Sequence, residues 1–245
     1  MNRQVPNMID TQYTIIGDGK IAKHFRHYFD LVEINYTSWN RKQPLRALQQ
    51  AVNNTDHVLV LISDDAIDKF INSHLFLKDK SLIHFSGSLT INGVAGCHPL
   101  MTFSDELYDL ETYRSIPFVI DDDRDFSSLF PQLENQAHHL AQKDKAIYHA
   151  LCVIAGNFTQ TLMRETNKQL SSELDLPYDI LFPYLLQNTK NFINKPNSSA
   201  TGPLQRNDFI TVNKHLLALK NNSLENIYQA FIQQDTKLKR VNNEH

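Results

Sequence analysis

Short apolar runs alternate with amphipathic segments through the first half of the chain, and this alternation constrains the fold more than any other feature. The run from His57 to Ile62 is almost continuously apolar, which is typical of a strand covered on both faces. Four shorter runs predict further strands, at residues 13–16, 31–36, 81–85 and 118–120. Strands that alternate with helical patterns predict a parallel α/β sheet with right-handed crossovers.

The pattern changes near residue 125. From Phe126 onward we find no strand, and five segments are predicted to be helices, at residues 126–142, 144–174, 177–195, 211–218 and 223–240. We therefore expect an α/β domain over residues 1–143, followed by an all-α domain over residues 144–245.

Composition excludes several classes of protein. The net charge of -3 lacks the basic excess that neutralises nucleic-acid phosphates. The two cysteines do not form a disulfide framework, and no apolar run approaches the roughly 20 residues that span a bilayer. The opening segment MNRQVPNMIDTQ lacks the apolar centre of a signal peptide. We expect a cytoplasmic protein without nucleic-acid or membrane partners.

A glycine turn follows the first predicted strand and opens the first predicted helix. It reads Gly17-Asp18-Gly19-Lys20-Ile21-Ala22 and fits the dinucleotide-binding pattern G-x-G-x-x-[GA]. The second glycine of this pattern lets the backbone approach a diphosphate, which lies against free N–H groups at the positive end of the helix dipole. The alternative is a turn whose glycines serve backbone geometry alone.

The end of the second strand predicts which dinucleotide is bound. NAD-binding turns usually place a carboxylate there, about 20 residues after the glycines. This chain instead has three hydrogen-bond donors, Asn40, Arg41 and Lys42, which suit the 2′-phosphate of NADP. A solvated basic turn is the alternative.

Two serines follow the third and fourth strands, where ligands of open α/β sheets bind. Ser63 is predicted to lie near the cofactor, and Ser86 to bind the nicotinamide amide or substrate oxygens. Asp64 and Asp65, directly after Ser63, are interpreted as part of a helix start.

The helix over 144–168 has two distinct faces. One is an apolar stripe, formed by Ile147, Leu151, Ile154, Phe158 and Leu162. The other is polar and contains a glycine, and consists of His149, Val153, Gly156, Asn157, Gln160 and Arg164. If this second face lines a cleft, His149 is the expected proton donor, with Asn157 beside the substrate. A solvated face with a capped histidine is the alternative.

Two more residues are candidate substrate contacts. His98 lies in Gly96–Leu100, which we interpret as a compact loop. Because Cys97 and His98 are adjacent and lack a spaced partner motif, we expect no metal site. Arg206 would clamp a carboxylate or phosphate, or else pair with Asp208 to cap the next helix. The runs His138–His139 and Asp121–Asp123 are interpreted as surface features.

Four segments carry a resemblance to a known family. They are GDGKIA, "IHFSGSL...GCHPLMTF" at 83–103, IYHALCVIAGNFTQTL at 147–162 and TGPLQRNDFITVNKHL at 201–216. They resemble an uncharacterised family that pairs a Rossmann-like NADP-binding domain with a helical C-terminal domain of unknown function. Its wider clan includes 6-phosphogluconate dehydrogenase, ketopantoate reductase and pyrroline-5-carboxylate reductase. The resemblance implies a cofactor domain and a helical domain that meet at a cleft, with dimerisation through the helices.

One departure affects the expected mechanism. The β-hydroxyacid dehydrogenases of this clan carry a catalytic lysine in the first long helix after the sheet domain, whereas we find no lysine beside Tyr148, His149 and Asn157. The leading hypothesis is an NADP-dependent oxidoreductase acting on a small carbonyl, imine or hydroxy-acid compound. The resemblance implies that it forms a homodimer through its helical domain. A non-catalytic NADP-binding or scaffold protein is the second hypothesis.

Overall fold

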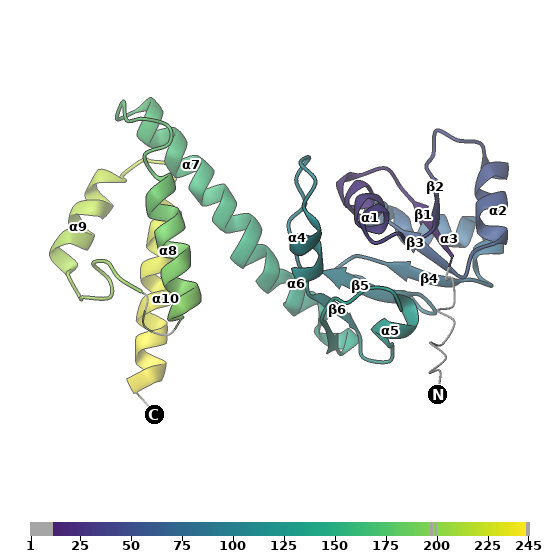
Figure 1. The fold of residues 1–245 in the computed structure, drawn as a ribbon. Coiled ribbons are helices and arrows are strands. Elements are labelled where there is room, and N and C mark those ends of the chain that lie inside the picture. The colour runs from purple at the N-terminus through teal and green to yellow at the C-terminus, as the bar shows by residue number, and fades with distance from the viewer. Residues whose placement is uncertain (1–11, 197, 199, 244–245) are drawn as a thin grey trace, which may run out of the picture. The chain divides into compact units, whose positions relative to one another are not determined.

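The computed structural model describes residues 12–196, 198 and 200–243, and Figure 1 shows its fold. Residues 1–11 of the initial segment MNRQVPNMIDTQ, which was expected not to be a signal peptide, lie outside the described residues. The chain divides into two compact units, Met1–Leu162 and Met163–His245. The predicted boundary between residues 143 and 144 falls just before a helix of the first unit.

The first unit is built on a seven-stranded sheet of order β2-β1-β3-β4-β5-β6-β7. Its strands are β1 (Tyr13–Ile16), β2 (Tyr36–Trp39), β3 (His57–Val60), β4 (Ser81–His84), β5 (Ala95–Pro99), β6 (Phe118–Asp121) and β7 (Ala137–Leu140). The first five are parallel, β6 is antiparallel to β5, and β7 is parallel to β6. The chain leaves β1 for β2 on one side and returns to β3 on the other, which makes the β1–β3 boundary a topological switch point.

Helices cover both faces of this sheet (Figure 1). They are α1 (Lys20–Leu31), α2 (Leu45–Asn53), α3 (Asp64–Ser73), α4 (Leu110–Ser115) and α5 (Phe126–Leu129). The helix α6 (Lys145–Val153) follows β7, and short 3-10 turns lie at Leu75–Leu77 and Gln142–Asp144. One core packs α1, α4 and α5 against the sheet, and the other packs α2 and α3. In β3, Val58 and Val60 face one core and Leu59 the other, so the continuous apolar run reflects burial on both faces. The predicted Rossmann-type α/β fold is confirmed.

One predicted strand was wrong in position, and another strand was not predicted. The second strand begins at Tyr36 rather than Leu31, because Leu31 still belongs to α1 and Glu33 turns the chain with a φ of 55°. The segment interpreted as the Gly96–Leu100 loop is largely β5. Its glycine and proline concealed a strand that pairs with β4 and β6.

The prediction of one helix over 126–142, with no strand after Phe126, was also wrong. The helix α5 ends at Leu129, shortly before Pro131, because the residue preceding a proline is disfavoured in helical conformation. The chain then forms β7 along the edge of the sheet. The Asn135 amide fixes this return by donating to the carbonyl oxygens of Tyr113 and Ile116, at 2.8 and 2.9 Å.

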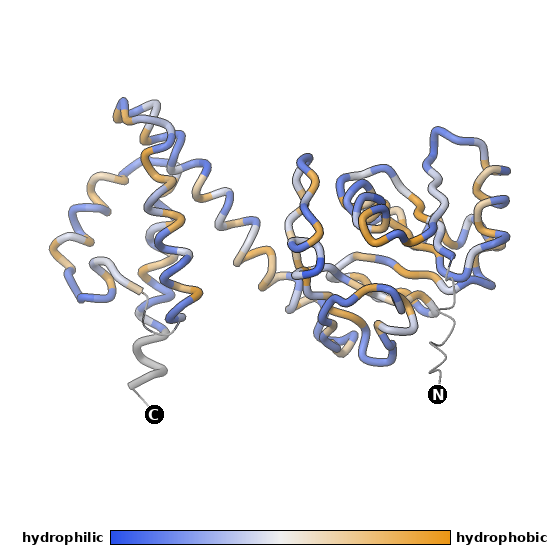
Figure 2. The backbone as a smooth tube through the Cα atoms, viewed as in Figure 1, coloured by the Kyte–Doolittle hydropathy of each residue, from blue (hydrophilic) through white to orange (hydrophobic). Residues whose placement is uncertain are grey.

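The second unit is helical in its described part. In the first unit, a π-helical turn (Ile154–Phe158) joins α6 to α7 (Thr159–Ser172), and the division between the units falls within α7. The helices α8 (Phe182–Asn194), α9 (Phe209–Ala218) and α10 (Glu225–Asn243) follow in the second unit. Figure 2 shows hydrophobic residues recurring along these helices. Among the described residues, no helix is both long and apolar enough to cross a membrane.

Candidate functional site

Two cavities of the first unit contain most of the candidate residues. The glycine-turn cavity, of about 710 Å³, is lined by Ile16, Gly17, Asp18, Gly19, Ile21, Trp39, Asn40, Arg41, Lys42, Leu61, Ile62, Ser63, Ala66 and Phe70. These residues follow the ends of β1, β2 and β3, so the cavity lies at the switch point of the sheet.

Gly17 is required by the backbone of this cavity. Its φ is 129°, and a Cβ added there would lie 2.1 Å from the carbonyl oxygen of Leu61. Its N–H donates to the Trp39 carbonyl oxygen at 2.9 Å, so the turn after β1 is held by the end of β2. Only glycine combines this conformation with such a close approach.

Gly19 leaves space rather than filling a tight contact. It is the N-cap residue of α1 without a side-chain cap, and an added Cβ would meet no atom within 4 Å. The first-turn N–H groups of α1 therefore face the cavity without a capping side chain, as an anion-binding helix start requires. The Asp18 carboxylate, which also lines the cavity, is paired with Arg26 at 3.0 Å.

The turn Asn40–Lys42 after β2, which we call the basic tip, also lines the glycine-turn cavity. The Asn40 side chain accepts the Lys42 N–H at 3.0 Å, and the Asn40 N–H donates to Gln43 Oε1 at 2.8 Å. These bonds fix the turn and leave the exposed Arg41 and Lys42 side chains beside the cavity.

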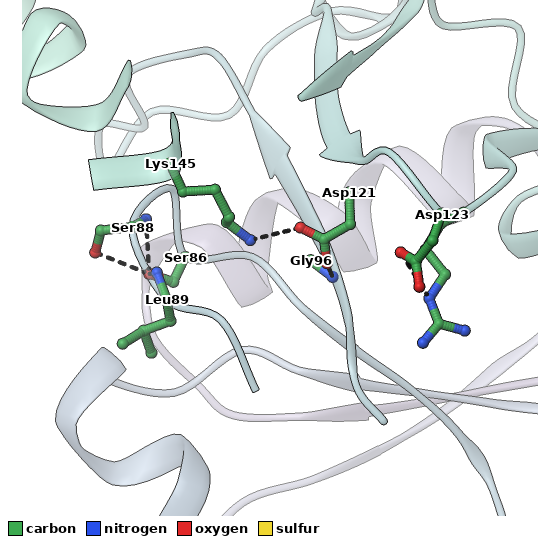
Figure 3. Close-up of polar contacts among 8 residues, drawn as sticks. Ser86, Ser88, Leu89, Gly96, Asp121, Asp123 and Lys145 are labelled. Carbon is green, nitrogen blue, oxygen red and sulfur yellow. Dashed lines mark hydrogen bonds and ion pairs between the residues drawn. The ribbon is translucent and has the colours of Figure 1, made fainter. Parts of the chain in front are cut away.

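Two predicted cofactor contacts lie outside this lining. Lys20 forms an exposed ion pair with Asp105, at 3.1 Å. The Ser86 hydroxyl donates to Asp64 at 2.5 Å and accepts the N–H groups of Ser88 and Leu89 at 3.3 and 3.2 Å; Figure 3 shows the bond from Ser88. Asp64 thus occupies the first turn of α3 and links the ends of β3 and β4.

The second cavity, the histidine cavity, has a volume of about 680 Å³. It is lined by His98, Leu100, Met101, Thr102, Tyr148, His149, Leu151, Cys152, Val153, Ala155, Gly156, Asn157 and Gln160. Because β1 to β5 are parallel, the end of β5 that carries His98 lies along the same sheet edge as the glycine-turn cavity. The first five residues of the predicted polar face, His149 to Gln160, all line this cavity.

Three rings, those of His98, Tyr148 and His149, lie close together in the wall of the histidine cavity, and Gly87 packs against two of them. His98 Nδ1 lies 2.8 Å from the Tyr148 hydroxyl, and the His98 and His149 ring centroids are 5.9 Å apart. A Cβ on Gly87 would lie 2.7 Å from His149 Cδ2 and 3.2 Å from the His98 ring. Gly87 therefore lets the backbone after β4 approach both imidazoles.

Burial sets the protonation of these rings. Burial first, and then electrostatic interaction with the neighbouring His149, lowers the pKa of His98 to about 4, so His98 is neutral at pH 7. Burial and the neighbouring Cys152 raise the pKa of Tyr148 well above its usual value, so the phenol keeps its proton. A protonated phenol can donate to neutral His98 and fix its tautomer.

The π-helical turn shapes the wall that carries Asn157. Such turns inside α-helices recur at functional sites. Here Gly156 and Asn157 lie within the turn and line the cavity, and a Cβ on Gly156 would meet no atom within 4 Å. The predicted apolar stripe on the same helices is exposed, with Ile147, Ile154 and Phe158 each more than half accessible.

A buried ion pair that we did not predict anchors α6. Lys145 Nζ lies 2.9 Å from Asp121 Oδ1, and Asp121 Oδ2 accepts the Gly96 N–H at 2.6 Å (Figure 3). Both charged side chains are almost completely buried. A Cβ on Gly96 would lie 2.2 Å from Lys145 Nζ and 2.9 Å from Asp121 Oδ2, so any other residue there would displace the buried ion pair.

This ion pair corrects two interpretations. Asp121 is not a surface residue, although His138 and His139 are exposed as expected. A lysine does share the helix face of His149, because Lys145 precedes it by four residues. Extending the predicted polar face back by one turn would have found Lys145.

Arg206 lies in the second unit. It is exposed and precedes α9, which Asp208 caps by accepting the Thr211 N–H at 3.0 Å. These hydrogen bonds from Thr211 are the main reason for the lowered pKa of Asp208, and Arg206 contributes less. Asp208 therefore caps the helix through Thr211.

Comparisons with known proteins support the fold. The sequence model of a domain of unknown function (DUF2520) matches residues 121–234. No curated protein is significantly similar in sequence. Among solved structures, a proposed NADP oxidoreductase from Bacteroides fragilis has a TM-score of 0.73 and 19% identity, covering 93% of this chain and 98% of that chain.

Two further structures are similar over almost the whole chain. A protein from Thermotoga maritima has a TM-score of 0.69 and 23% identity, covering 94% of this chain and 99% of that one. Pyrroline carboxylate reductase from Plasmodium falciparum, solved with NADP bound, has a TM-score of 0.58 and 13% identity, with 94% and 98% covered. At these identities the similarity establishes a shared Rossmann-like fold.

Proposed function

We propose that this chain is an NADP-dependent oxidoreductase that reduces a small carbonyl or imine compound, or oxidises the corresponding hydroxy compound or amine. The observation that carries the proposal is the pairing of two cavities along one sheet edge, one built around a glycine turn and one around three proton-bearing rings. Structural neighbours named as an NADP oxidoreductase and an NADP-bound reductase support this cofactor class.

The glycine-turn cavity fits a dinucleotide phosphate. The uncapped N–H groups at Gly19 and the first turn of α1 would hold the diphosphate. Arg41 and Lys42 would bind the 2′-phosphate, and Ser63 would lie beside the nucleotide. Lys20 and Ser86, the other two predicted cofactor contacts, do not line the glycine-turn cavity and would contact only a part of the cofactor that extends beyond it.

The histidine cavity supplies the proton chemistry. Bound NADPH would supply a hydride to the carbon of a C=O or C=N bond, whose oxygen or nitrogen takes a proton to give an alcohol or amine and NADP⁺. The His149 imidazole would donate that proton and recover one from solvent, since its ring is only partly buried. Asn157 would orient the substrate, and His98 would contact it as a neutral ring.

Nucleotide binding tests this function directly. We expect calorimetry to show tighter binding of NADPH than of NADH, and NADPH at 100 times its Kd to stabilise the fold by about 2.7 kcal/mol. Arg41→Ala should reduce the NADPH preference by about tenfold or more, because it removes a charge-assisted phosphate contact. Arg46→Ala, an exposed arginine outside the cavity lining, is the matched control.

Two results would contradict the proposal. Absence of nucleotide binding at millimolar concentration, or tighter binding of NADH, refutes the cofactor assignment. A panel of ketones and imines, followed by loss of NADPH absorbance, then tests catalysis. Binding of NADPH without turnover of any panel member favours the non-catalytic alternative.

We also propose that the chain forms a homodimer through its second unit. The described part of that unit exposes many large apolar side chains, including Tyr184, Phe192, Ile193, Ile210 and Leu217. Apolar surface of this extent is typical of an interface. Light scattering should give twice the mass of one chain, and Ile193→Glu should reduce it. A monomer at micromolar concentration contradicts the proposal.

A further inference from the structure

The described walls of the histidine cavity contain no residue that is permanently charged at neutral pH. None of the thirteen described residues that line it is a lysine, arginine, aspartate or glutamate. Its apolar wall is formed by Leu100, Met101, Leu151, Val153 and Ala155. Hydrogen-bonding groups come from the three rings, Thr102, Asn157 and Gln160.

The ionisable groups His98 and Lys145 do not give the histidine cavity an unpaired positive charge. His98 is neutral at pH 7 because burial lowers its pKa to about 4. Lys145 reaches Asp121, at 2.9 Å (Figure 3), and both side chains are almost completely buried. A ligand in the histidine cavity therefore meets the ammonium of Lys145 only together with its carboxylate partner.

In the glycine-turn cavity, where the proposed function places phosphate groups, the same unit presents cations. Arg41 and Lys42 line that cavity, beside the positive end of α1. An anionic substrate would need an equivalent cation, because a carboxylate moved from water against apolar walls loses solvation that nothing replaces. A neutral carbonyl or imine needs only the donors that the three rings and Asn157 provide.

We propose that the histidine cavity binds a neutral carbonyl or imine compound with an apolar substituent, in preference to a keto acid or other carboxylate. This inference rests on the proposed function, because it names the substrate class of the same site. The reacting C=O or C=N group would accept hydrogen bonds from the polar rings. The substituent would pack against Leu100, Met101 and Val153, in a volume within the usual range for small-molecule sites.

Two matched pairs of compounds test the inference. Acetophenone and phenylglyoxylate differ by a methyl group in place of a carboxylate, as do 2-methyl-1-pyrroline and 1-pyrroline-2-carboxylate. We expect the neutral member of each pair to bind the NADP⁺-loaded protein at least about tenfold more tightly in calorimetry. The same preference should appear in KM where NADPH is consumed.

A charge-introducing variant makes the test specific to this cavity. Leu100→Arg places a guanidinium at a lining position that is 40% exposed, where it can be tolerated. It should shift the binding ratio toward the carboxylate by about tenfold. Leu107→Arg introduces the same charge at a 45% exposed leucine outside the lining and should leave the ratio unchanged.

Three results would overturn the inference. They are equal or tighter binding of the carboxylates to the wild-type protein, no binding of either neutral compound, and a ratio that Leu100→Arg does not move. Failure of NADP⁺ to bind counts against the proposed function instead. In that case the same pairs, titrated into the protein without nucleotide, still decide the preference of the cavity.

Discussion

The two cavities of the first unit are built in different ways. The glycine-turn cavity comes from short stretches of backbone that directly follow three parallel strands. The histidine cavity depends on side chains about fifty residues apart in sequence, since His98 of β5 meets Tyr148 and His149 of α6. The first cavity therefore depends on local backbone geometry, and the second on the packing that places α6.

The largest expected effect tests that dependence on packing. Asp121→Asn removes the partner of a buried lysine, and an unpaired buried charge costs about 3–5 kcal/mol. Chemical denaturation should show this loss in the free energy of unfolding. The double variant Asp121→Asn with Lys145→Met should recover much of it, because no buried charge remains. A loss below about 1 kcal/mol in the single variant would show that the pair does not anchor α6.

The next largest effect concerns the glycine-turn cavity. Gly17→Ala forces a Cβ against the Leu61 carbonyl oxygen at a φ that L-residues rarely adopt, so we expect a loss of about 2–4 kcal/mol. NADPH binding should be lost with it. The matched variant Gly19→Ala has space for its methyl group and should keep the stability while weakening NADPH binding. Equal stability losses in the two variants would contradict this assignment of roles.

The same contrast explains how much the sequence could predict. The glycine pattern, the basic tip and Ser63 each follow a strand directly, so locating the strands was enough to bring these residues together. Helical periodicity likewise placed His149, Gly156 and Asn157 on one face, which lines the second cavity. Both predictions succeeded because they depend only on residues that are close together in the sequence.

What could not be predicted depends on contacts between distant segments. Gly96 reads as a loop residue, and only the presence of Lys145 and Asp121 explains a glycine within β5. Asp121 belongs to an acidic run that is usually solvated, and the pairing of β6 with β5 is what buries it. The π-helical turn has no sequence pattern of its own. Periodicity cannot report these contacts, because each partner lies on another element.

The free energy of unfolding should decrease as the pH falls from 6.5, because the buried His84 resists protonation in the folded state. His84, completely buried at the end of β4, has a pKa lowered to about 4 by burial and then by Lys145. Since unfolded histidine has a pKa near 6.5, the unfolded state binds more protons between pH 6.5 and 4. This contribution is full above pH 6.5 and declines as the pH falls, by about 2 kcal/mol at pH 5.

Replacing the ring tests this cause. Neither His84 nitrogen has a hydrogen-bond partner among the described residues, so His84→Phe removes no such bond. Unfolding curves of this variant should lose less stability between pH 7 and 5 than those of the wild type. An unchanged pH slope would assign the effect to other groups, such as His98, whose lowered pKa acts in the same direction.

The smallest expected effect separates two uses of glycine. Gly156→Ala adds a methyl group that meets no atom within 4 Å, in a helical segment where alanine is favoured by up to about 1 kcal/mol. Thermal unfolding should show equal or slightly higher stability, and the NADPH Kd should not change. The methyl group enters the histidine cavity, so the KM of a neutral ketone should rise several-fold. Stability loss like that expected of Gly17→Ala would mean that Gly156, too, is needed by the backbone, whereas an unchanged KM would place the substrate away from the π-helical turn.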